Sequence, residues 1–352
     1  MIGIVGGGLA AAKVVEGYRD AGGTEAFTIW SQDPHGPYHR PPLSKRLLRG
    51  EAEPADTLVH PADWYTEHDV DLRVGQHVGS LDEFDADTIV IATGSRPRAL
   101  EGALALRTLD DSLELRRRAA DARRAVVVGG GFIGLEVTAS LTQLGVQVTQ
   151  IVRDEHVFAA LQAPALSEAL HERYREHGVD LRLGASDIPA GVDLIVAGIG
   201  VEPNVELGRD AGLEVRIGIV VNERFETSKP GVYAIGDVAE FFDPLFGRHR
   251  RIEHWSNAAY HGTTLGRILA GEDAHYDTVS SFFSEQFGRS FKSFGDPLGH
   301  DTTALEGDFR EDRAVLRFLR GGKAVAAVTT GLDEDAETAL KDEIRAGAAA
   351  SR

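Results

Sequence analysis

The fold is decided by the stretch IGIVGGGLAA at Ile2–Ala11. It joins an apolar run to three glycines and an alanine-rich segment, and a second apolar run ends at Ile29. A strand, a tight turn, a helix and a returning strand form a βαβ unit with parallel strands. The pattern is repeated at Ala125–Val152, where GGGFIG occupies Gly129–Gly134. The offset of 123 residues between Gly6 and Gly129 is the size of a domain, so two α/β domains are predicted.

Each glycine turn has the residues that a dinucleotide pyrophosphate requires. One glycine makes the turn, a second lets the backbone approach the phosphates, and a small residue packs the helix on the strand. Unpaired N–H groups at the helix N-terminus then favour the anion. These positions are Gly6, Gly8 and Ala11 in the first copy and Gly129, Gly131 and Gly134 in the second. One copy is weak evidence, but two copies in one chain predict two bound dinucleotides.

A proline-rich stretch, PHGPYHRPPLSK at Pro34–Lys45, closely resembles the hallmark of flavin-dependent ferredoxin and rubredoxin reductases, relatives of apoptosis-inducing factor. Further matches follow in that family's order and cover nearly the whole chain. They are ATGSRPR at Ala92–Arg98, GIGVEPN at Gly198–Asn204, VYAIGD at Val232–Asp237 and IEHWSNA at Ile252–Ala258. The resemblance implies FAD in the first unit, a nicotinamide dinucleotide in the second and a C-terminal domain near the flavin.

The predicted fold class is therefore α/β, with two Rossmann-like dinucleotide-binding domains, the second inserted in the first, and a C-terminal α+β domain. The expected boundaries are 1–105 and 222–278 for the FAD-binding domain, 106–221 for the NAD(P)H-binding domain and 279–352 for the C-terminal domain. The last domain alternates in hydrophobicity from about Val279 and closes with a helix near Asp335–Arg345. Its alanine-rich end is expected to fray.

The resemblance also implies roles for side chains around FAD. Asp237, which otherwise resembles a turn-capping carboxylate, is expected to accept a hydrogen bond from the ribityl chain, and Trp255 to lie beside the isoalloxazine. Asp33 is the candidate for the adenosine ribose, with Gln32 as the alternative that the register allows. The residues expected to bind FAD are Gly6, Gly8, Leu9, Ala10, Ala11, Asp33, Arg40, Lys45, Thr93, Gly94, Arg96, Gly236, Asp237, Glu253, His254 and Trp255.

The second nucleotide is predicted to be NADPH, with NADH as the alternative. NAD-selective sites place an acidic residue at the end of the second strand, where this chain has Val152 followed by Arg153. An arginine can grip a 2′-phosphate in a fork, although Asp154 and Glu155 weaken the site for an anion. The residues expected to contact this nucleotide are Gly129, Gly131, Phe132, Ile133, Gly134, Glu136, Arg153, His156, Gly198 and Gly200.

Lys45 and Glu136 are the expected catalytic residues. In the family that the chain resembles, these positions form an ion pair near the reactive ring nitrogen of the flavin and the nicotinamide. Taken alone, each residue is better explained as an exposed lysine and an ordinary helix glutamate. A partly desolvated pair can orient the nicotinamide and stabilise negative charge on the reduced flavin.

Composition excludes several other classes. The chain of 352 residues has no cysteine, which excludes disulfides, thiolate metal sites and a redox dithiol. Pro34, Gly36 and Pro37 forbid the helix that would align His35 and His39 as ligands, so no metal site is predicted. The net charge of −18 argues against nucleic acid and anionic membranes as partners. With no basic leader and no apolar run near the roughly 20 residues that span a bilayer, a cytoplasmic location is predicted.

The leading functional prediction is an NAD(P)H-dependent reductase of a small acidic ferredoxin or rubredoxin-like protein. One alternative is a diaphorase or oxidase that reduces quinones or oxygen. Another is a flavoprotein whose redox state gates binding to a partner. An acidic partner requires locally concentrated positive charge. The candidate docking surface is Arg248–Arg251, extended by Arg289 and Lys292.

Overall fold

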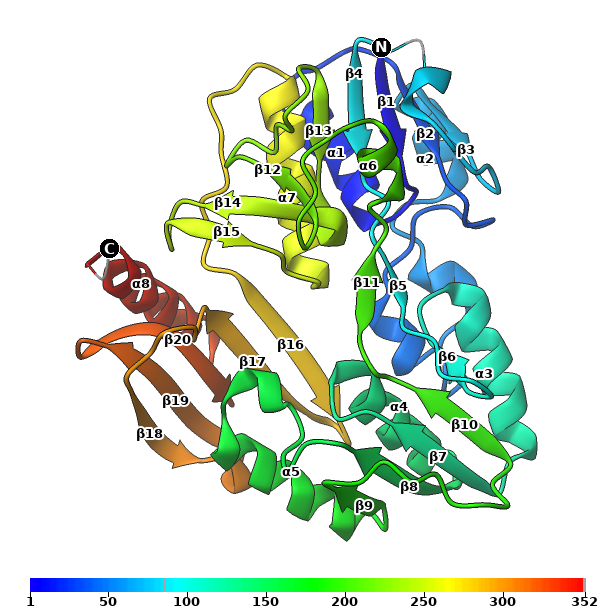
Figure 1. Ribbon diagram of the computed structural model, residues 1–352, viewed down its shortest axis with the longest axis vertical. Coiled ribbons are helices and arrows are strands. Elements are labelled where there is room, and N and C mark those ends of the chain that lie inside the picture. The colour runs from blue at the N-terminus through cyan, green and yellow to red at the C-terminus, as the bar shows by residue number, and fades with distance from the viewer. Residues whose placement is uncertain (85, 351–352) are drawn as a thin grey trace. The chain divides into compact units, whose positions relative to one another are not determined.

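A computed structural model describes residues 1–84 and 86–350 of the chain, which folds into two compact units (Figure 1). Unit 1 comprises Met1–His39, Ala55–Arg96 and Glu202–Thr278. Unit 2 comprises Arg40–Pro54, Pro97–Val201 and Val279–Arg352. The chain thus passes repeatedly from one unit to the other, and two of the passages lie in the paired strands β5 (Ser95–Pro97) and β11 (Val201–Pro203).

Unit 1 is built on a parallel five-stranded sheet in the order β13-β4-β1-β2-β3. Its strands are β1 (Ile2–Val5), β2 (Phe27–Trp30), β3 (Val70–Arg73), β4 (Thr88–Ile91) and β13 (Val232–Ala234). The helices of this unit are α1 (Leu9–Asp20), α2 (Ala62–Glu67), α6 (Glu206–Asp210) and α7 (Trp255–Leu269). All four residues of β1 are buried, as expected for a central parallel strand.

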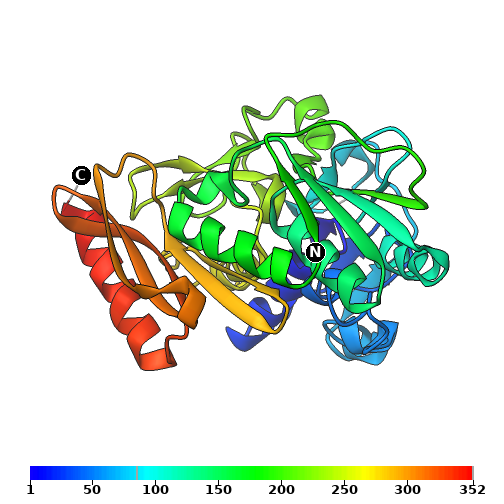
Figure 2. The ribbon, with the colours of Figure 1, turned by 90° about the horizontal axis from the view of Figure 1, so that it is seen from below.

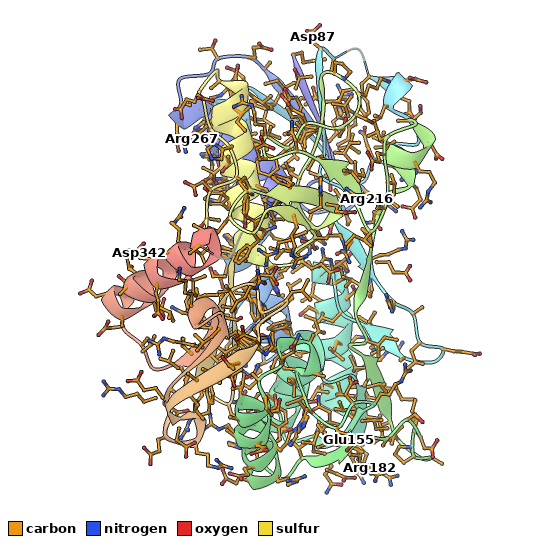
Figure 3. The ribbon with its side chains drawn as sticks, turned by 60° about the vertical axis from the view of Figure 1, so that its left-hand side comes forward. Asp87, Glu155, Arg182, Arg216, Arg267 and Asp342 are labelled. Carbon is orange, nitrogen blue, oxygen red and sulfur yellow. The ribbon has the colours of Figure 1, made fainter. Side chains whose placement is uncertain are left out.

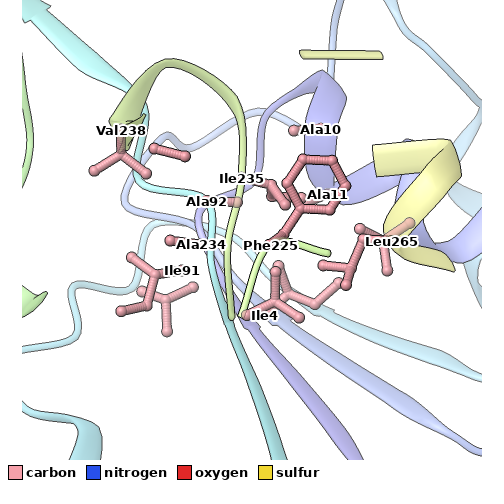
Figure 4. Close-up of a cluster of buried hydrophobic side chains, with 14 of the residues drawn as sticks. Ile4, Ala10, Ala11, Ile91, Ala92, Phe225, Ala234, Ile235, Val238 and Leu265 are labelled. Carbon is pink, nitrogen blue, oxygen red and sulfur yellow. The ribbon is translucent and has the colours of Figure 1, made fainter. Parts of the chain in front are cut away.

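Helices α1 and α7 meet at direct backbone contacts. A Cβ atom on Gly262 would lie 2.4 Å from the carbonyl oxygen of Ala10, and one on Gly266 would lie 2.3 Å from that of Val14. Only glycine permits this approach. Ala10, Ala11 and Leu265 from the two helices then join Ile4 and Ile91 of the sheet in the apolar cluster of Figure 4. The close packing of α1, α7 and the sheet therefore fixes the position of the turn between β1 and α1.

A small sheet of β12 (Ile219–Val221), β14 (Ala239–Asp243) and β15 (Arg248–Arg250) completes unit 1. Two arginines of the predicted docking surface, Arg250 and Arg251, are paired with carboxylates here. Arg250 is only 9% exposed, and its Nη1 lies 2.7 Å from Oδ2 of the fully buried Asp243. Arg251 forms an ion pair with Glu253. Arg250 holds two strands together from inside the unit, and neither arginine presents an uncompensated charge to a partner.

The proposed extension of that surface is neutralised in the same way. The Nζ atom of Lys292 lies 2.6 Å from a carboxylate oxygen of Glu337, and Arg289 forms an ion pair with Asp312. Sequence alone could not reveal these pairings, because each carboxylate comes from a distant part of the chain.

Unit 2 contains a second parallel sheet in the order β6-β10-β7-β8-β9. The strands are β6 (Leu104–Ala105), β7 (Arg124–Val128), β8 (Gln147–Val152), β9 (Asp180–Leu183) and β10 (Leu194–Ala197). The associated helices are α3 (Leu109–Asp121), α4 (Phe132–Gln143) and α5 (Pro164–Glu176). The two parallel sheets confirm the predicted α/β class and the duplicated βαβ pattern.

The same unit carries an antiparallel sheet in the order β16-β17-β20-β19-β18. Its strands are β16 (Ser281–Gln286), β17 (Arg289–Gly295), β18 (Thr302–Asp308), β19 (Arg313–Arg320) and β20 (Lys323–Thr330), and helix α8 (Glu334–Ala350) lies along it (Figure 2). Leu135 and Val152 share one apolar cluster with Phe291 and Phe318. The nucleotide-binding sheet and the C-terminal sheet therefore pack as one body.

The expectation of a frayed C-terminal segment is wrong as far as Ala350. Helix α8 continues through the alanine-rich stretch, with Ile344 and Ala348 buried. A Cβ on Gly347 would lie 2.0 Å from the carbonyl oxygen of Ala324, so the helix backbone rests directly on β20. Small residues allow this close packing, which composition alone cannot distinguish from disorder. No helix within the described residues is long and apolar enough to span a membrane.

Candidate nucleotide-binding and redox site

In unit 1, the first glycine motif forms the turn that its residues predict. Gly6 has φ +116°, and a Cβ there would lie 2.1 Å from the carbonyl oxygen of Ala92. Gly8 is the N-cap of α1 and has no side chain to cap the helix, and the first turn contains no acidic residue. Leu9, Ala10 and Ala11 form that first turn and are buried. The N-terminus of α1 thus offers backbone donors to an anion.

The loop after β4 is tied to the segment before α6. Thr93 Oγ1 donates to the carbonyl oxygen of Asn204 at 2.8 Å, and Asn204 Nδ2 donates back to the carbonyl oxygen of Thr93 at 2.8 Å. Gly94 has φ +67° and accepts from the backbone N–H of Asn204. Arg96 is half exposed, with Nη1 2.8 Å from a carboxylate oxygen of Glu206. This predicted FAD residue therefore already has an acidic partner.

The Gly236–Asp237 turn is fixed by two residues that sequence reasoning missed. Asp237 is 8% exposed, and its Oδ2 accepts a hydrogen bond from Ser95 Oγ at 2.9 Å. Gly236 has φ +72°, and its N–H donates to Nδ1 of the buried His261 at 3.1 Å. Burial lowers the pKa of His261 to about 3, so its ring is neutral and can accept. Ser95 lies within a motif, whereas no pattern marked His261.

The start of α7 brings together the next three predicted residues. His254 is the N-cap, and burial lowers its pKa to about 4. Glu253 is paired with Arg251. Trp255 is 39% exposed, and its Nε1–H donates to Nδ1 of His39 at 3.0 Å. Because this hydrogen bond orients the indole while leaving much of it uncovered, Trp255 presents an aromatic surface on unit 1.

Both oxygens of the Asp33 carboxylate accept hydrogen bonds from residues of the same loop. Its Oδ1 accepts from the backbone N–H of His35 at 3.0 Å and its Oδ2 from Tyr38 OH at 2.7 Å. Gln32, the alternative for the ribose, is exposed. The geometry therefore favours Gln32 as the polar side chain that faces outward beyond β2.

In unit 2, four glycines bring the β7–α4 turn against the end of β10. Gly129 has φ +123°, and a Cβ there would lie 2.2 Å from the carbonyl oxygen of Gly198. A Cβ on Gly134 would lie 2.4 Å from the carbonyl oxygen of Gly129, and one on Gly198 would lie 2.6 Å from the nitrogen of Gly134. Gly200 follows with φ +96°. Any larger residue at Gly129, Gly134 or Gly198 would push the loops apart.

Gly131 is different, because nothing lies within 4 Å of a Cβ built there. It is the N-cap of α4, which has no side-chain cap and no acidic residue in its first turn. Ile133 belongs to that turn, and the ring of Phe132 packs 4.8 Å from Phe158 and 4.9 Å from Phe282. An open, uncapped helix N-terminus beside a glycine has the form of a pyrophosphate cradle.

Beyond β8, Val152 is buried and Arg153 is exposed, with no side-chain partner among the described residues. His156 stacks on His171 with ring centroids 6.0 Å apart. Glu155 is exposed and approaches the position of a Cβ on Gly184, just after β9. Figure 3 labels Glu155 and Arg182 at this edge of unit 2, where they project outward. The edge thus carries one unpaired guanidinium together with acidic neighbours.

Lys45 and Glu136 meet within unit 2. Lys45 Nζ lies 2.6 Å from Glu136 Oε2, and the two side chains are 12% and 6% exposed. The 3₁₀ turn Pro41–Ser44 sets Lys45 against α4, and Arg40 precedes this turn as its N-cap. Lys45 Nζ also lies 6.0 Å from the centroid of the Phe283 ring, which is 42% exposed. A largely buried ion pair therefore stands beside an accessible aromatic ring.

Both helix N-termini satisfy what a dinucleotide requires: a glycine turn that no larger residue could adopt, uncapped N–H groups and no nearby first-turn carboxylate. The residues present therefore fit FAD at α1 and a nicotinamide dinucleotide at α4. Within the described residues no group of three or more His, Cys, Asp or Glu side chains could hold a metal ion.

Known proteins share these features. The family model for pyridine nucleotide-disulphide oxidoreductases matches residues 2–187 and 190–262. Putidaredoxin reductase of Pseudomonas putida is 32% identical, over 93% of this chain and 87% of that protein. The ferredoxin–NAD(+) reductase component of the anthranilate 1,2-dioxygenase system of Burkholderia cepacia is 32% identical, over 94% of this chain and 91% of that protein. A solved covalent putidaredoxin reductase–putidaredoxin complex has a TM-score of 0.91 at 31% identity, covering 97% of this chain and 93% of that one.

The fold and the two glycine cradles define an α/β oxidoreductase that binds two dinucleotides. The chain belongs to the pyridine nucleotide-disulphide oxidoreductase family. It is a flavin-dependent NAD(P)H oxidoreductase, and the resemblance to ferredoxin and rubredoxin reductases drawn from its motifs is confirmed.

Proposed function

We propose that this protein transfers electrons from NADPH through FAD to a small ferredoxin or rubredoxin-like protein. The observation that carries the proposal is the buried Lys45–Glu136 pair, in a chain with two dinucleotide cradles and no cysteine for a disulfide route. Held at the N-terminus of α1 and by Asp237, FAD would supply the conversion of two-electron hydride chemistry into the single-electron transfer that a one-electron acceptor requires. The relatives named as reductases of putidaredoxin and ferredoxin support this class of acceptor.

We propose that residues 1–105 and 222–278 hold FAD, that 106–221 hold the nicotinamide dinucleotide and that 279–352 form the C-terminal domain. In the FAD part, the N–H groups at α1 bind the pyrophosphate, and Asp237, fixed by Ser95, accepts from the ribityl chain. Gln32 takes the ribose in place of Asp33, whose carboxylate is already engaged. Trp255 contributes the exposed aromatic surface beside the flavin.

Lys45 is proposed to act as the group that orients the nicotinamide, with Glu136 fixing its ammonium. Lys45→Ala and Glu136→Ala should slow flavin reduction in a stopped-flow experiment while FAD content stays at the wild-type level. Lys292→Ala is the matched control, because it also removes a lysine paired with a carboxylate in unit 2. If flavin is reduced at the wild-type rate in both variants, the Lys45–Glu136 pair has no role in hydride transfer.

The acceptor is tested by steady-state assays with ferredoxins, a rubredoxin, quinones and oxygen. We expect the iron–sulfur proteins to give the highest kcat/KM. Turnover with quinones or oxygen alone would identify a diaphorase or oxidase. Very slow flavin reduction with a long-lived charge-transfer complex would identify a redox-gated binding protein instead.

The preference for NADPH over NADH rests on Arg153, which is exposed and has no side-chain partner among the described residues, and on the absence of a carboxylate at Val152. A charge-assisted contact to the 2′-phosphate should make Arg153→Gln lower kcat/KM for NADPH by about tenfold and leave NADH nearly unchanged. Arg175→Gln, an exposed arginine on α5, is the control. A wild-type kcat/KM for NADH equal to that for NADPH would refute the preference.

A further inference from the structure

The carboxylate of Glu136 receives three donors from two separate segments of the chain. Its Oε2 accepts from Lys45 Nζ at 2.6 Å and from Ser44 Oγ at 2.5 Å. Its Oε1 accepts from Ser284 Oγ at 2.7 Å. Ser44 belongs to the proline-rich signature, whereas Ser284 lies on β16 of the C-terminal sheet, 148 residues beyond Glu136. No motif pointed to Ser284.

Ser284 is itself fixed by a second buried residue. Gln286 Nε2 donates to Ser284 Oγ at 2.5 Å, and the two residues are 2% and 0% exposed, respectively. They are two apart on a strand, so they share one face of the sheet. The Ser284 oxygen accepts a hydrogen bond from Gln286, so the single hydroxyl proton of Ser284 is donated to Glu136. The direction of this chain of hydrogen bonds is therefore determined, from Gln286 through Ser284 to Oε1.

The two carboxylate oxygens consequently have separate tasks. Oε1 is held by the C-terminal sheet, and Oε2 is presented to Lys45. Without the donor at Oε1, the carboxylate can rotate about its terminal bond, because that torsion is broad. Leaving the buried Oε1 without a donor also costs free energy, which favours a rotation of the carboxylate that brings Oε1 toward the other donors, Ser44 and Lys45. Either movement displaces the lysine ammonium.

We propose that Ser284, oriented by Gln286, is a positioning residue that fixes the Glu136 carboxylate and, through it, the Lys45 ammonium for hydride transfer. The inference rests on the proposed role of the Lys45–Glu136 pair. It gives the C-terminal sheet a part in the chemistry of the nucleotide site, to which it is joined in one apolar core.

The test compares Ser284→Ala with Ser284→Thr, which retains the hydroxyl, and with Ser293→Ala. Ser293 is a buried serine on the neighbouring strand β17, paired in register with Phe282. Loss of one hydrogen bond to a charged group should slow flavin reduction by about tenfold in Ser284→Ala, whereas Ser284→Thr and the control stay within about twofold of wild type. Should Ser284→Ala fail to fold, Gln286→Met frees the hydroxyl without removing it and should also slow reduction.

A second readout does not depend on turnover. The chain has six lysines, so the ¹⁵Nζ signal of Lys45 can be assigned in the FAD-bound protein by loss of one signal in Lys45→Arg. We expect Ser284→Ala to displace that signal and Ser293→Ala to leave it in place. An unmoved Lys45 signal would overturn the proposal whatever the acceptor proves to be.

The decisive comparison is a double-mutant cycle. In a Glu136→Gln background, Ser284→Ala should cause no further slowing, because its effect passes through the carboxylate. A further loss of tenfold would mean that Ser284 acts by another route and would refute the inference. Failure to reduce ferredoxin would count only against the proposed acceptor, since flavin reduction and the lysine signal are measured without it.

Discussion

The buried histidine behind the Gly236–Asp237 turn predicts that unit 1 loses stability in acid. His261 is fully buried among Phe225, Phe241 and Tyr276, and its Nδ1 accepts from the N–H of Gly236. Burial lowers its pKa to about 3, compared with about 6.5 for a histidine in an unfolded chain. Because the folded pKa is the lower one, the stabilisation is present above pH 6.5 and is lost as the pH falls toward 3.

The magnitude follows from proton linkage. Each pH unit between the two pKa values costs about 1.4 kcal/mol, so His261 alone removes about 2 kcal/mol by pH 5. His254, whose pKa burial lowers to about 4, removes a similar amount by that pH. Together they remove about 4 kcal/mol, a large share of the stability of an ordinary domain.

The assay is urea unfolding at pH 7 and pH 5, followed by tryptophan fluorescence. All three tryptophans, Trp30, Trp64 and Trp255, lie in unit 1, so the signal reports that unit. His261→Gln offers a neutral acceptor to Gly236 and should reduce the pH-dependent loss by about 2 kcal/mol. His275→Gln, at an exposed position of the same unit, should not. An equal loss in wild type and His261→Gln would refute the reasoning.

Three further predictions concern packing and charge. Gly266→Ala forces a methyl to within 2.3 Å of the Val14 carbonyl and should lower the unfolding free energy of unit 1 by about 1–3 kcal/mol in urea. Arg250→Ala leaves the Asp243 carboxylate buried without its cation and should cost about 3–5 kcal/mol in the same measurement, whereas a docking role would change only the ferredoxin KM. Because Arg250, Arg251, Arg289 and Lys292 are each paired with a carboxylate and the net charge is −18, the KM for an acidic ferredoxin should not rise between about 0.05 and 0.3 M salt; a several-fold rise would contradict this.

The candidate site was predicted from sequence where a local physical constraint selects the residue type. Gly6 and Gly129 are identifiable because only glycine adopts positive φ so close to a neighbouring strand. The Pro34–Lys45 signature was informative for a different reason, because it resembles the hallmark of the ferredoxin and rubredoxin reductases. The constraints on the glycines act within a few residues, and they can be recognised before the chain folds.

The features that sequence missed depend on burial and on partners that only the folded chain brings together. Asp243 lies seven residues from Arg250, but sequence alone does not show that the pair of strands β14 and β15 buries both charges, and the run Arg248–Arg251 looked like an exposed basic patch for that reason. Helix α8 looked frayed because its contact with Ala324 is made by backbone atoms. Likewise, Ser284 looked like an ordinary strand residue.

The sequence by itself therefore determined the two βαβ units and their glycine cradles, and its resemblance to the reductase family added the flavin-dependent class and the Lys45–Glu136 pair. Only the tertiary structure decided that Ser44 and Ser284 complete the environment of Glu136, that His261 supports Gly236 and that Asp243 neutralises Arg250. The physical reason is the range of the interactions. Turn geometry and strand burial are encoded locally, whereas the partner of a buried hydrogen bond or charge is chosen by the packing of distant segments.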